Sequence, residues 1–196
     1  VGGYKNMVGL FSPAEFVLCD VQLLSTLPER EFRAGVAEII KSAIVGDKEL
    51  FELLERGSLE QLRQDGGVLA EAVRRAALVK CGLVADDPYD RGVRRLLNLG
   101  HTMAHAIESQ SDQLTHGEAV AVGLVWASQR AVKRGLLSPE EALRIGSVVE
   151  KYGLPTSTSL PEEELCEAMT HDKKASGGKV RLVLPRGVGD CVVVEE

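Results

Sequence analysis

Apolar residues recur along most of this chain at the spacing of an amphipathic helix. After a charged first turn at residues 29–31, the apolar side chains that fall three or four positions apart are Phe32, Val36, Ile39, Ile40 and Ala43. This period places one apolar face of a helix toward a core. Further helices are predicted over residues 48–55, 69–84, 92–108, 118–133 and 139–152, with a last short helix from Pro161.

Short apolar runs bounded by turn residues predict strands in three places. Residues 180–184 and 191–194 flank a Pro/Gly turn and predict a β-hairpin near the C-terminus. The run Phe-Val-Leu-Cys-Asp at residues 16–20 predicts one more short strand. We therefore expect a mainly α fold, a multi-helix domain over residues 1–196 with a short β-hairpin near its C-terminus.

Composition narrows the class of protein. The chain has 196 residues, 44% hydrophobic and 27% charged, which is ordinary for a globular domain. A net charge of −6 argues against a nucleic-acid surface, and no apolar run reaches the roughly 18 residues of a membrane span. The four cysteines are widely spaced without a CxxC pair, which predicts reduced thiols in the core of a cytoplasmic protein. The start, "VGGYKNMVGLF", lacks an initiator Met, so we expect missing upstream sequence.

Three of the four histidines lie in one stretch, "NLGHTMAHAIESQSDQLTHGEAV", residues 98–120. His101 and His105 are four residues apart, the spacing with which one helix face can offer two metal ligands. Thr102 stands where the HExxH metalloprotease helix has its glutamate, so the protease interpretation fails. A zinc site that activates a substrate commonly has two histidines and a carboxylate, and the spacing leaves open whether His105 or His116 completes the set.

Glu38 is the candidate acidic ligand, because it lies among apolar residues in "GVAEIIK". A buried carboxylate has to be paired or coordinated, whereas a carboxylate on the solvent face needs no explanation. Cationic and amide side chains accompany these positions in the sequence: Lys41, Lys80, Arg94 and Asn98. A metal beside such groups suits an anionic substrate that carries a carboxylate or phosphate.

Several motifs together resemble the 3-dehydroquinate synthase family: "GGYKNMVGLF", "LLSTLPERE", "GVAEIIK", "RRLLNLGHTMAHAIE", "HGEAVAVGL" and "DKKASGGKVRLVLPRGVG". They occur in the family's order from about residue 2 to residue 189. The resemblance implies the helical, metal- and substrate-binding C-terminal domain of the family. The family's N-terminal, NAD-binding Rossmann-like domain is expected to be absent from these 196 residues.

The resemblance also implies roles for particular residues. It makes Glu38, His101 and His116 the ligands of a divalent metal, zinc or cobalt, and it places His105 beside the substrate phosphate. The positions that match further substrate contacts are Lys80, Arg94, Asn98, Asn6, Lys41 and Lys173, with Lys174 as the alternative to the last. The positions that match part of the NAD site are Lys5, Leu23, Leu24, Ser25 and Thr26.

The activity implied by the resemblance is conversion of 3-deoxy-D-arabino-heptulosonate 7-phosphate, a phosphorylated sugar acid, to 3-dehydroquinate and phosphate in the shikimate pathway. NAD oxidises an alcohol transiently and returns the hydride after phosphate has left, while the metal polarises the alcohol oxygen. The family is commonly dimeric, so a homodimer is expected for the full enzyme. Without the cofactor domain, this chain is expected to be inactive.

Three alternatives share part of the pattern. Another sugar-phosphate cyclase, such as a 2-deoxy-scyllo-inosose or valiolone synthase, would keep the metal ligands and change the substrate contacts. A polyol dehydrogenase related to the iron- or zinc-dependent alcohol dehydrogenases fits the cationic set less well. A non-catalytic helical assembly domain would have no reason to keep an acid, three histidines and their cationic neighbours.

Overall fold

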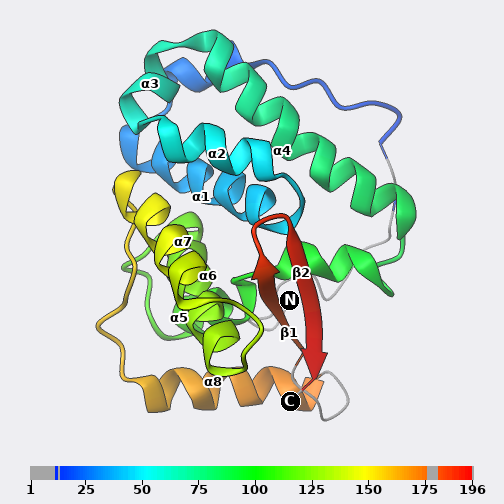
Figure 1. The fold of residues 1–196 in the computed structure, drawn as a ribbon, viewed down its shortest axis with the longest axis vertical. Helices are drawn as coiled ribbons and strands as arrows, with labels where there is room; N and C mark the ends of the chain where they lie inside the picture. The colour runs from blue at the N-terminus through cyan, green and yellow to red at the C-terminus, as the bar shows by residue number, and fades with distance from the viewer. Residues whose placement is uncertain (1–11, 13, 176–180, 196) are drawn as a thin grey trace.

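Helices α1 and α6 form the centre of the molecule and the other elements pack around them, in a computed structural model that describes residues 12, 14–175 and 181–195 (Figure 1). In chain order the elements are η1 (Val21–Thr26), α1 (Glu29–Gly46), α2 (Lys48–Arg56), α3 (Leu59–Gln64), α4 (Gly66–Asp86), η2 (Val93–Asn98), α5 (His101–Gln110), α6 (His116–Lys133), α7 (Pro139–Lys151), α8 (Glu162–Ala175), β1 (Arg181–Gly187) and β2 (Asp190–Glu195). The predicted mainly α fold with a C-terminal hairpin is confirmed.

Helix α1 begins directly after Pro28, with Glu29 and Glu31 in its first turn. Carboxylates at this end interact favourably with the positive end of the helix dipole. The apolar face predicted from the sequence is buried: Val36 and Ile40 have almost no exposed surface. This face packs against α6, while α2, α4 and the hairpin cover other sides of α1. The helix that carries Glu38 is therefore fixed from several directions.

Helix α6 begins with a capping box, in which the Thr115 hydroxyl accepts from the Glu118 N–H and the Glu118 carboxylate accepts from the Thr115 N–H. Small residues follow, and most of the helix is buried between α1, α5, α7 and β1. The cap fixes the first turn of α6, so the position of His116 at its start is well defined.

The C-terminal hairpin pairs β1 with β2 in antiparallel register, with Leu184 opposite Val192. Gly189 supplies the left-handed turn residue, with φ of 83°, and its N–H donates to the Ile44 carbonyl at 2.9 Å. The hairpin is thus hydrogen-bonded to α1 as well as packed against it.

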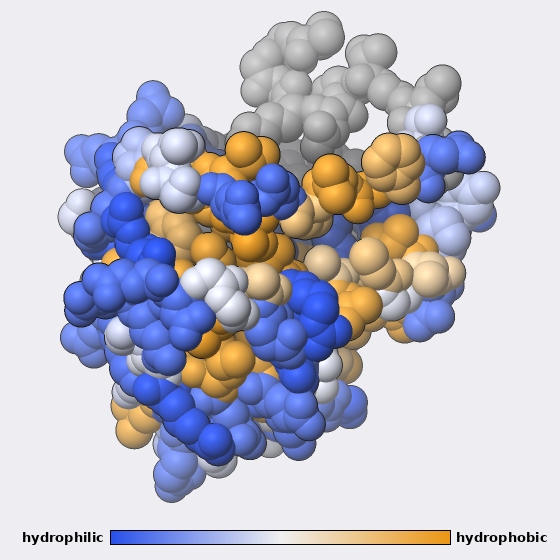
Figure 2. All heavy atoms as spheres, turned by 90° about the horizontal axis from the view of Figure 1, so that it is seen from above, coloured by the Kyte–Doolittle hydropathy of each residue, from blue (hydrophilic) through white to orange (hydrophobic). Residues whose placement is uncertain are grey.

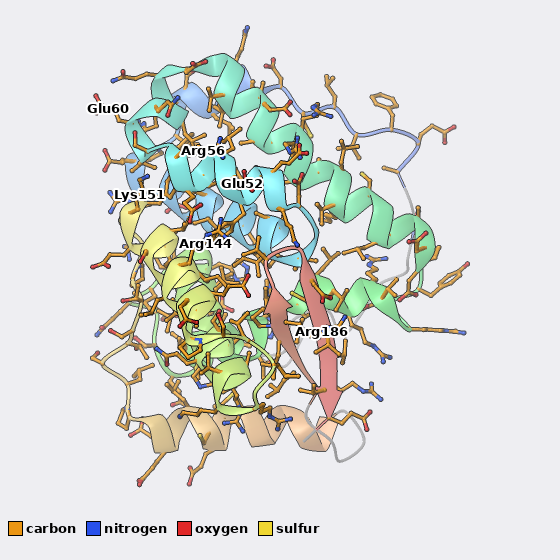
Figure 3. All side chains as sticks on the ribbon, viewed as in Figure 1. Glu52, Arg56, Glu60, Arg144, Lys151 and Arg186 are labelled. Atoms are coloured by element: carbon orange, nitrogen blue, oxygen red, sulfur yellow. The ribbon has the colours of Figure 1, made fainter. Side chains whose placement is uncertain are left out.

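Charged side chains cover the outer face of α2 and α7 (Figure 3). Arg144 of α7 makes two hydrogen bonds to the Glu55 carboxylate of α2, at 2.5 and 2.8 Å, and the Lys151 ammonium donates to the Glu55 carbonyl at 2.6 Å. On α2 itself, Arg56 pairs with Glu52 at 2.9 Å. The contacts of Arg144 and Lys151 with Glu55 join two helices that are far apart in sequence.

Two predicted elements are wrong. Residues 16–20 form an extended segment and not a strand, because no neighbouring strand is present among the described residues to pair with it. The single helix predicted over residues 92–108 is broken into η2 and α5 by Gly100, whose φ of 78° no right-handed helix allows. Arg94 and Asn98 therefore do not share a helix with His101.

The sequence prediction omitted α3, whose only buried side chain is Leu62, because six residues with a single core contact show no apolar period.

The prediction that all four cysteines are core thiols is also wrong. Cys191 is buried, whereas Cys19, Cys81 and Cys166 are exposed; all four are unpaired. Among the described residues, no helix combines the length and the apolar character that crossing a membrane requires.

Candidate metal centre

Three elements that meet at the centre of the fold each contribute one potential metal ligand. Glu38 comes from α1, His101 is the first residue of α5, and His116 is the first residue of α6. Their ligand atoms all lie within 4.8 Å of one another. The structure thus brings together the carboxylate and the two imidazoles that the resemblance names, and these atoms come from parts of the chain up to 78 residues apart in the numbering.

The distances fit a shared divalent cation. The Nε2 atom of His116 lies 3.4 Å and the Nε2 atom of His101 lies 3.7 Å from the same oxygen, Oε1 of Glu38. Two ligands at zinc-bonding distance in tetrahedral geometry are separated by roughly 3.4 Å. Glu38 and His116 also keep 37% and 47% of their side-chain surface exposed, so the cluster has an open side where a substrate oxygen could bind.

The orientation of both imidazoles is fixed through the other ring nitrogen. Nδ1 of His101 lies 3.2 Å from the Leu99 carbonyl oxygen, and Nδ1 of His116 lies 3.2 Å from Oε1 of Glu108. An acceptor at Nδ1 favours a proton there and leaves the Nε2 lone pair for a metal. Both Nε2 atoms face the same carboxylate oxygen, as a ligand set requires.

Lys41 forms an ion pair with the second carboxylate oxygen of Glu38. Its ammonium nitrogen lies 2.6 Å from Oε2 of Glu38, and its side chain is only 9% exposed. Burial is the largest influence on Glu38 and opposes its ionisation, but the charge and hydrogen bond of Lys41, with smaller contributions from His101 and His116, outweigh it, so the pKa of Glu38 lies below its ordinary value. Burial, with help from Lys41, lowers the pKa of His101. An ionised carboxylate and a neutral imidazole are the protonation states that bind a metal.

A close backbone contact places His101. Gly100, in its left-handed conformation, precedes α5, and its carbonyl accepts from the Ala104 N–H at 3.0 Å. A Cβ built on Gly123 of α6 would lie 2.0 Å from the Gly100 carbonyl oxygen. Only a glycine at position 123 lets α6 approach this turn so closely, so the two helices that carry the histidines are held together at that point.

Of the remaining candidate substrate residues, His105 has a contact with this cluster. The His105 ring is 5.7 Å from the His101 ring, centroid to centroid, and is exposed one turn along α5. Lys80 is exposed on α4, and η2 carries Arg94 and Asn98 immediately before the Gly100 turn. Arg94 donates to the Pro88 carbonyl at 2.8 Å. The roles of these residues stay predictions.

The predicted cofactor contacts are in part within the described residues. The stretch Leu23–Thr26 belongs to η1, where Leu24 is half-buried and Leu23 is exposed. The hydroxyls of Ser25 and Thr26 donate to carbonyls of the same turn. Lys5 and Asn6 lie outside the described residues, and of Lys173 only its place in the backbone of α8 is described.

Sequence reasoning missed two acidic residues, one in contact with the cluster and one in the loop before η2. Glu108 contacts His116, and the signal was available, since seven residues after His101 is two turns along the same helix face. Asp87 accepts from the N–H groups of Arg91, Gly92 and Arg94 and so shapes the loop before η2. A loop carboxylate of this kind has no periodic signal.

Fold and cluster together define a class: a helical domain that joins a carboxylate and two imidazoles from three helices in a zinc-type ligand set. Comparison with known families gives the particular one. The chain belongs to the family described as 3-dehydroquinate synthase C-terminal, whose model matches residues 35–175.

Individual relatives agree with this family. A 3-dehydroquinate synthase from Dehalococcoides mccartyi is 41% identical over 196 residues, and one from Halorhodospira halophila is 44% identical over 195 residues. These alignments cover 99% and 98% of this chain but 55% of each relative, so the chain spans about half the length of the curated proteins it matches.

Solved structures show the same fold. The 2-epi-5-epi-valiolone synthase of Streptomyces hygroscopicus, with NAD+ and Zn2+ bound, has a TM-score of 0.88 at 34% identity, over 98% of this chain and 54% of that one. A 2-deoxy-scyllo-inosose synthase complexed with carbaglucose-6-phosphate, NAD+ and Co2+ has a TM-score of 0.80 at 24% identity, over 97% and 56% of the two chains.

Proposed function

We propose that this chain is the metal- and substrate-binding part of a 3-dehydroquinate synthase, acting in the cytoplasm on 3-deoxy-D-arabino-heptulosonate 7-phosphate. The observation that carries the proposal is the convergence of Glu38, His101 and His116, with their Nε2 and Oε1 atoms at metal-sharing distances. The family match and the relatives of 41–44% identity support the choice of reaction.

The chemistry divides between bound groups and side chains. A metal held by Glu38, His101 and His116 supplies Lewis-acid activation of a substrate alcohol oxygen, and a bound NAD supplies a reversible hydride acceptor. Lys41 keeps Glu38 ionised and correctly rotated through its 2.6 Å contact. Lys80, Arg94, Asn98 and His105 bind and orient the phosphate and hydroxyl groups of the substrate, so the protein contributes chiefly by positioning.

A second candidate is another sugar-phosphate cyclase, because the valiolone synthase has the same fold at 34% identity and a bound Zn2+. Substrate binding separates the two. We expect the zinc-loaded chain to bind heptulosonate 7-phosphate in calorimetry more tightly than glucose 6-phosphate, because only the former offers a carboxylate to the cationic residues. Tighter binding of glucose 6-phosphate would favour the second candidate.

Three further measurements test the assignment. Metal analysis of the purified chain should find close to one zinc or cobalt per chain; absence of any bound divalent metal contradicts the proposal and favours an assembly domain. The Lys80→Gln variant should bind the sugar phosphate roughly tenfold more weakly, while the control Lys133→Gln, an exposed lysine on α6, should bind it normally. Phosphate release by the 196-residue chain with NAD and zinc should stay at background, since the cofactor site is proposed to need the rest of the relatives' length.

A further inference from the structure

The two imidazoles of the proposed metal centre differ in the group that lies next to their Nδ1 atoms. Nδ1 of His101 faces the main-chain carbonyl of Leu99, which the fold fixes two residues earlier. Nδ1 of His116 faces a side chain, the carboxylate of Glu108, at 3.2 Å. At Nδ1, one ligand thus has a backbone partner, whereas the other has a side-chain partner that a substitution can remove.

Glu108 is largely buried beside the start of α6. It lies two turns after His101 on α5, and its side chain is 20% exposed. Helix α5 packs against α6, so the end of α5 lies beside the start of α6, where His116 is located.

A partner at Nδ1 is needed to fix the orientation of the His116 ring. The capping box of Thr115 and Glu118 fixes the backbone of the first turn of α6, and Arg30 reinforces it with hydrogen bonds of 2.9 and 2.7 Å to the Glu118 carboxylate. None of these contacts reaches the imidazole itself, which is 47% exposed. Its Nε2 lies 3.4 Å from Oε1 of Glu38, so without an acceptor at Nδ1 the ring proton would favour Nε2 and would point toward that carboxylate.

We propose that Glu108 is a positioning residue for the metal centre, which holds the Nδ1–H tautomer of His116 and directs its Nε2 lone pair toward Glu38. This inference rests on the metal site of the proposed function and adds a residue that contacts the ligand and not the ion. A carboxylate at Nδ1 also raises the electron density at Nε2 and strengthens the bond to a metal. Outer partners of this kind typically change metal affinity by about 10–100-fold.

The first test needs no metal. In long-range 1H–15N spectra of histidine-labelled chain, at a pH where imidazole is neutral, we expect His116 of the wild type to carry its proton on Nδ1. Glu108→Met removes the acceptor and should move the population toward the Nε2–H tautomer. Glu108→Gln keeps an acceptor oxygen and should retain the wild-type tautomer. The control Gln110→Met removes an exposed polar side chain from the same helix and should change nothing.

The second test is zinc affinity, measured by competition with a chelator. We expect Glu108→Met to lose about 10–100-fold, Glu108→Gln to lose less than tenfold, and Gln110→Met to match the wild type. Thermal unfolding of the metal-free variants separates a folding defect from a site defect, and Glu108→Ala, which also removes the acceptor and has the same expected results, replaces Glu108→Met if that variant is unstable.

The outcomes separate two failures. A wild-type chain that binds no zinc overturns the metal site and with it the proposed function. A wild-type chain that binds zinc, with Glu108→Met showing the same affinity and the same His116 tautomer, overturns the role of Glu108 alone.

Discussion

His105 and His116 show how single residues with the same chemistry can have different places in a site. His105 lies one helical turn from His101, yet it is His116, fifteen residues further on, whose Nε2 lies 3.4 Å from the Glu38 carboxylate. His105 contacts the His101 ring edge-on at 5.7 Å and is exposed. The distances assign to the two histidines different expected effects on metal binding.

Replacing each histidine by alanine tests that assignment. We expect His116→Ala to weaken zinc binding by more than about 100-fold, beyond the range for outer partners, because it removes a ligand. His105→Ala serves as the matched control and should bind zinc within about threefold of the wild type while losing sugar-phosphate binding. Chelator competition and calorimetry report the two quantities. Equal loss of zinc affinity in both variants would contradict the proposed ligand set.

At the scale of elements, Asp47 connects three helices. It ends α1, caps α2 by accepting from the Leu50 N–H at 2.9 Å, and receives two hydrogen bonds from Arg75 of α4 at 2.7 and 2.8 Å. Burial raises the pKa of Asp47, but the contacts to Arg75 and the Leu50 N–H outweigh this effect. In the folded protein the pKa of Asp47 therefore lies below its ordinary value.

This pKa shift predicts a pH-dependent stability. A carboxyl group with a lowered folded pKa stabilises the protein above its unfolded pKa, near 3.8, and loses that contribution as pH falls through the folded pKa. We expect Asp47→Asn, which keeps a good capping residue, to cost roughly 1–2 kcal/mol of unfolding free energy at neutral pH. Denaturant titrations at decreasing pH should show the difference shrinking below about pH 4; a difference independent of pH would contradict the ion pair.

The contact between α6 and the turn before α5 is a second element-scale constraint. Gly123→Ala puts a Cβ 2.0 Å from the Gly100 carbonyl oxygen, so one backbone segment has to move. We expect a loss of about 1–3 kcal/mol in unfolding free energy, together with weaker zinc binding because His101 follows Gly100. Gly146→Ala in α7 is the control: nothing lies within 4 Å of its Cβ, and alanine should stabilise the helix by about 0.5–1 kcal/mol. Chemical denaturation of both variants measures the contrast, and equal effects would refute the close contact.

At the scale of the whole molecule, one end carries unusual apolar exposure. Phe16, Val17 and Leu18 are 81%, 78% and 84% exposed, and they form an extended segment along the α4 side, which also exposes Leu78. Apolar surface is visible over this end in the view from above (Figure 2). Consecutive apolar residues on both faces of an extended segment are typical of a strand buried inside a sheet. Among the described residues, no strand lies beside this segment, so its backbone and apolar side chains are available for association.

The chain studied alone should therefore associate through this segment. We expect sedimentation to show concentration-dependent oligomers for the wild type and mostly monomer for Val17→Asp, because a charge disfavours edge pairing and apolar contact. Leu143→Asp on α7, which replaces an isolated leucine that is 72% exposed, is the control and should behave as the wild type. Association that persists unchanged in Val17→Asp would show that another surface is responsible.

The sequence by itself determined the helices with long apolar periods, the C-terminal hairpin and the set of side chains from which a metal site could be made. Periodicity and spacing are local properties, so α1, α6 and the hairpin could be predicted from neighbouring residues alone. The strand over residues 16–20 was wrong because a strand exists only with a partner, and α3 was missed because one buried leucine gives no period.

The family resemblance named Glu38, His101 and His116 as ligands, but only the tertiary structure shows that their side chains meet. By spacing alone, His105 and His116 were equal candidates, and the packing of α1, α5 and α6 brings His116 and not His105 to the Glu38 carboxylate. The same packing pairs Glu108 of α5 with His116 of α6, whereas the pairing of Lys41 with Glu38, three residues apart on α1, follows from helix spacing. Distances between atoms on different helices depend on how closely the helices approach, which is fixed at Gly100 and Gly123 by backbone contact and has no signature in the local pattern of the sequence.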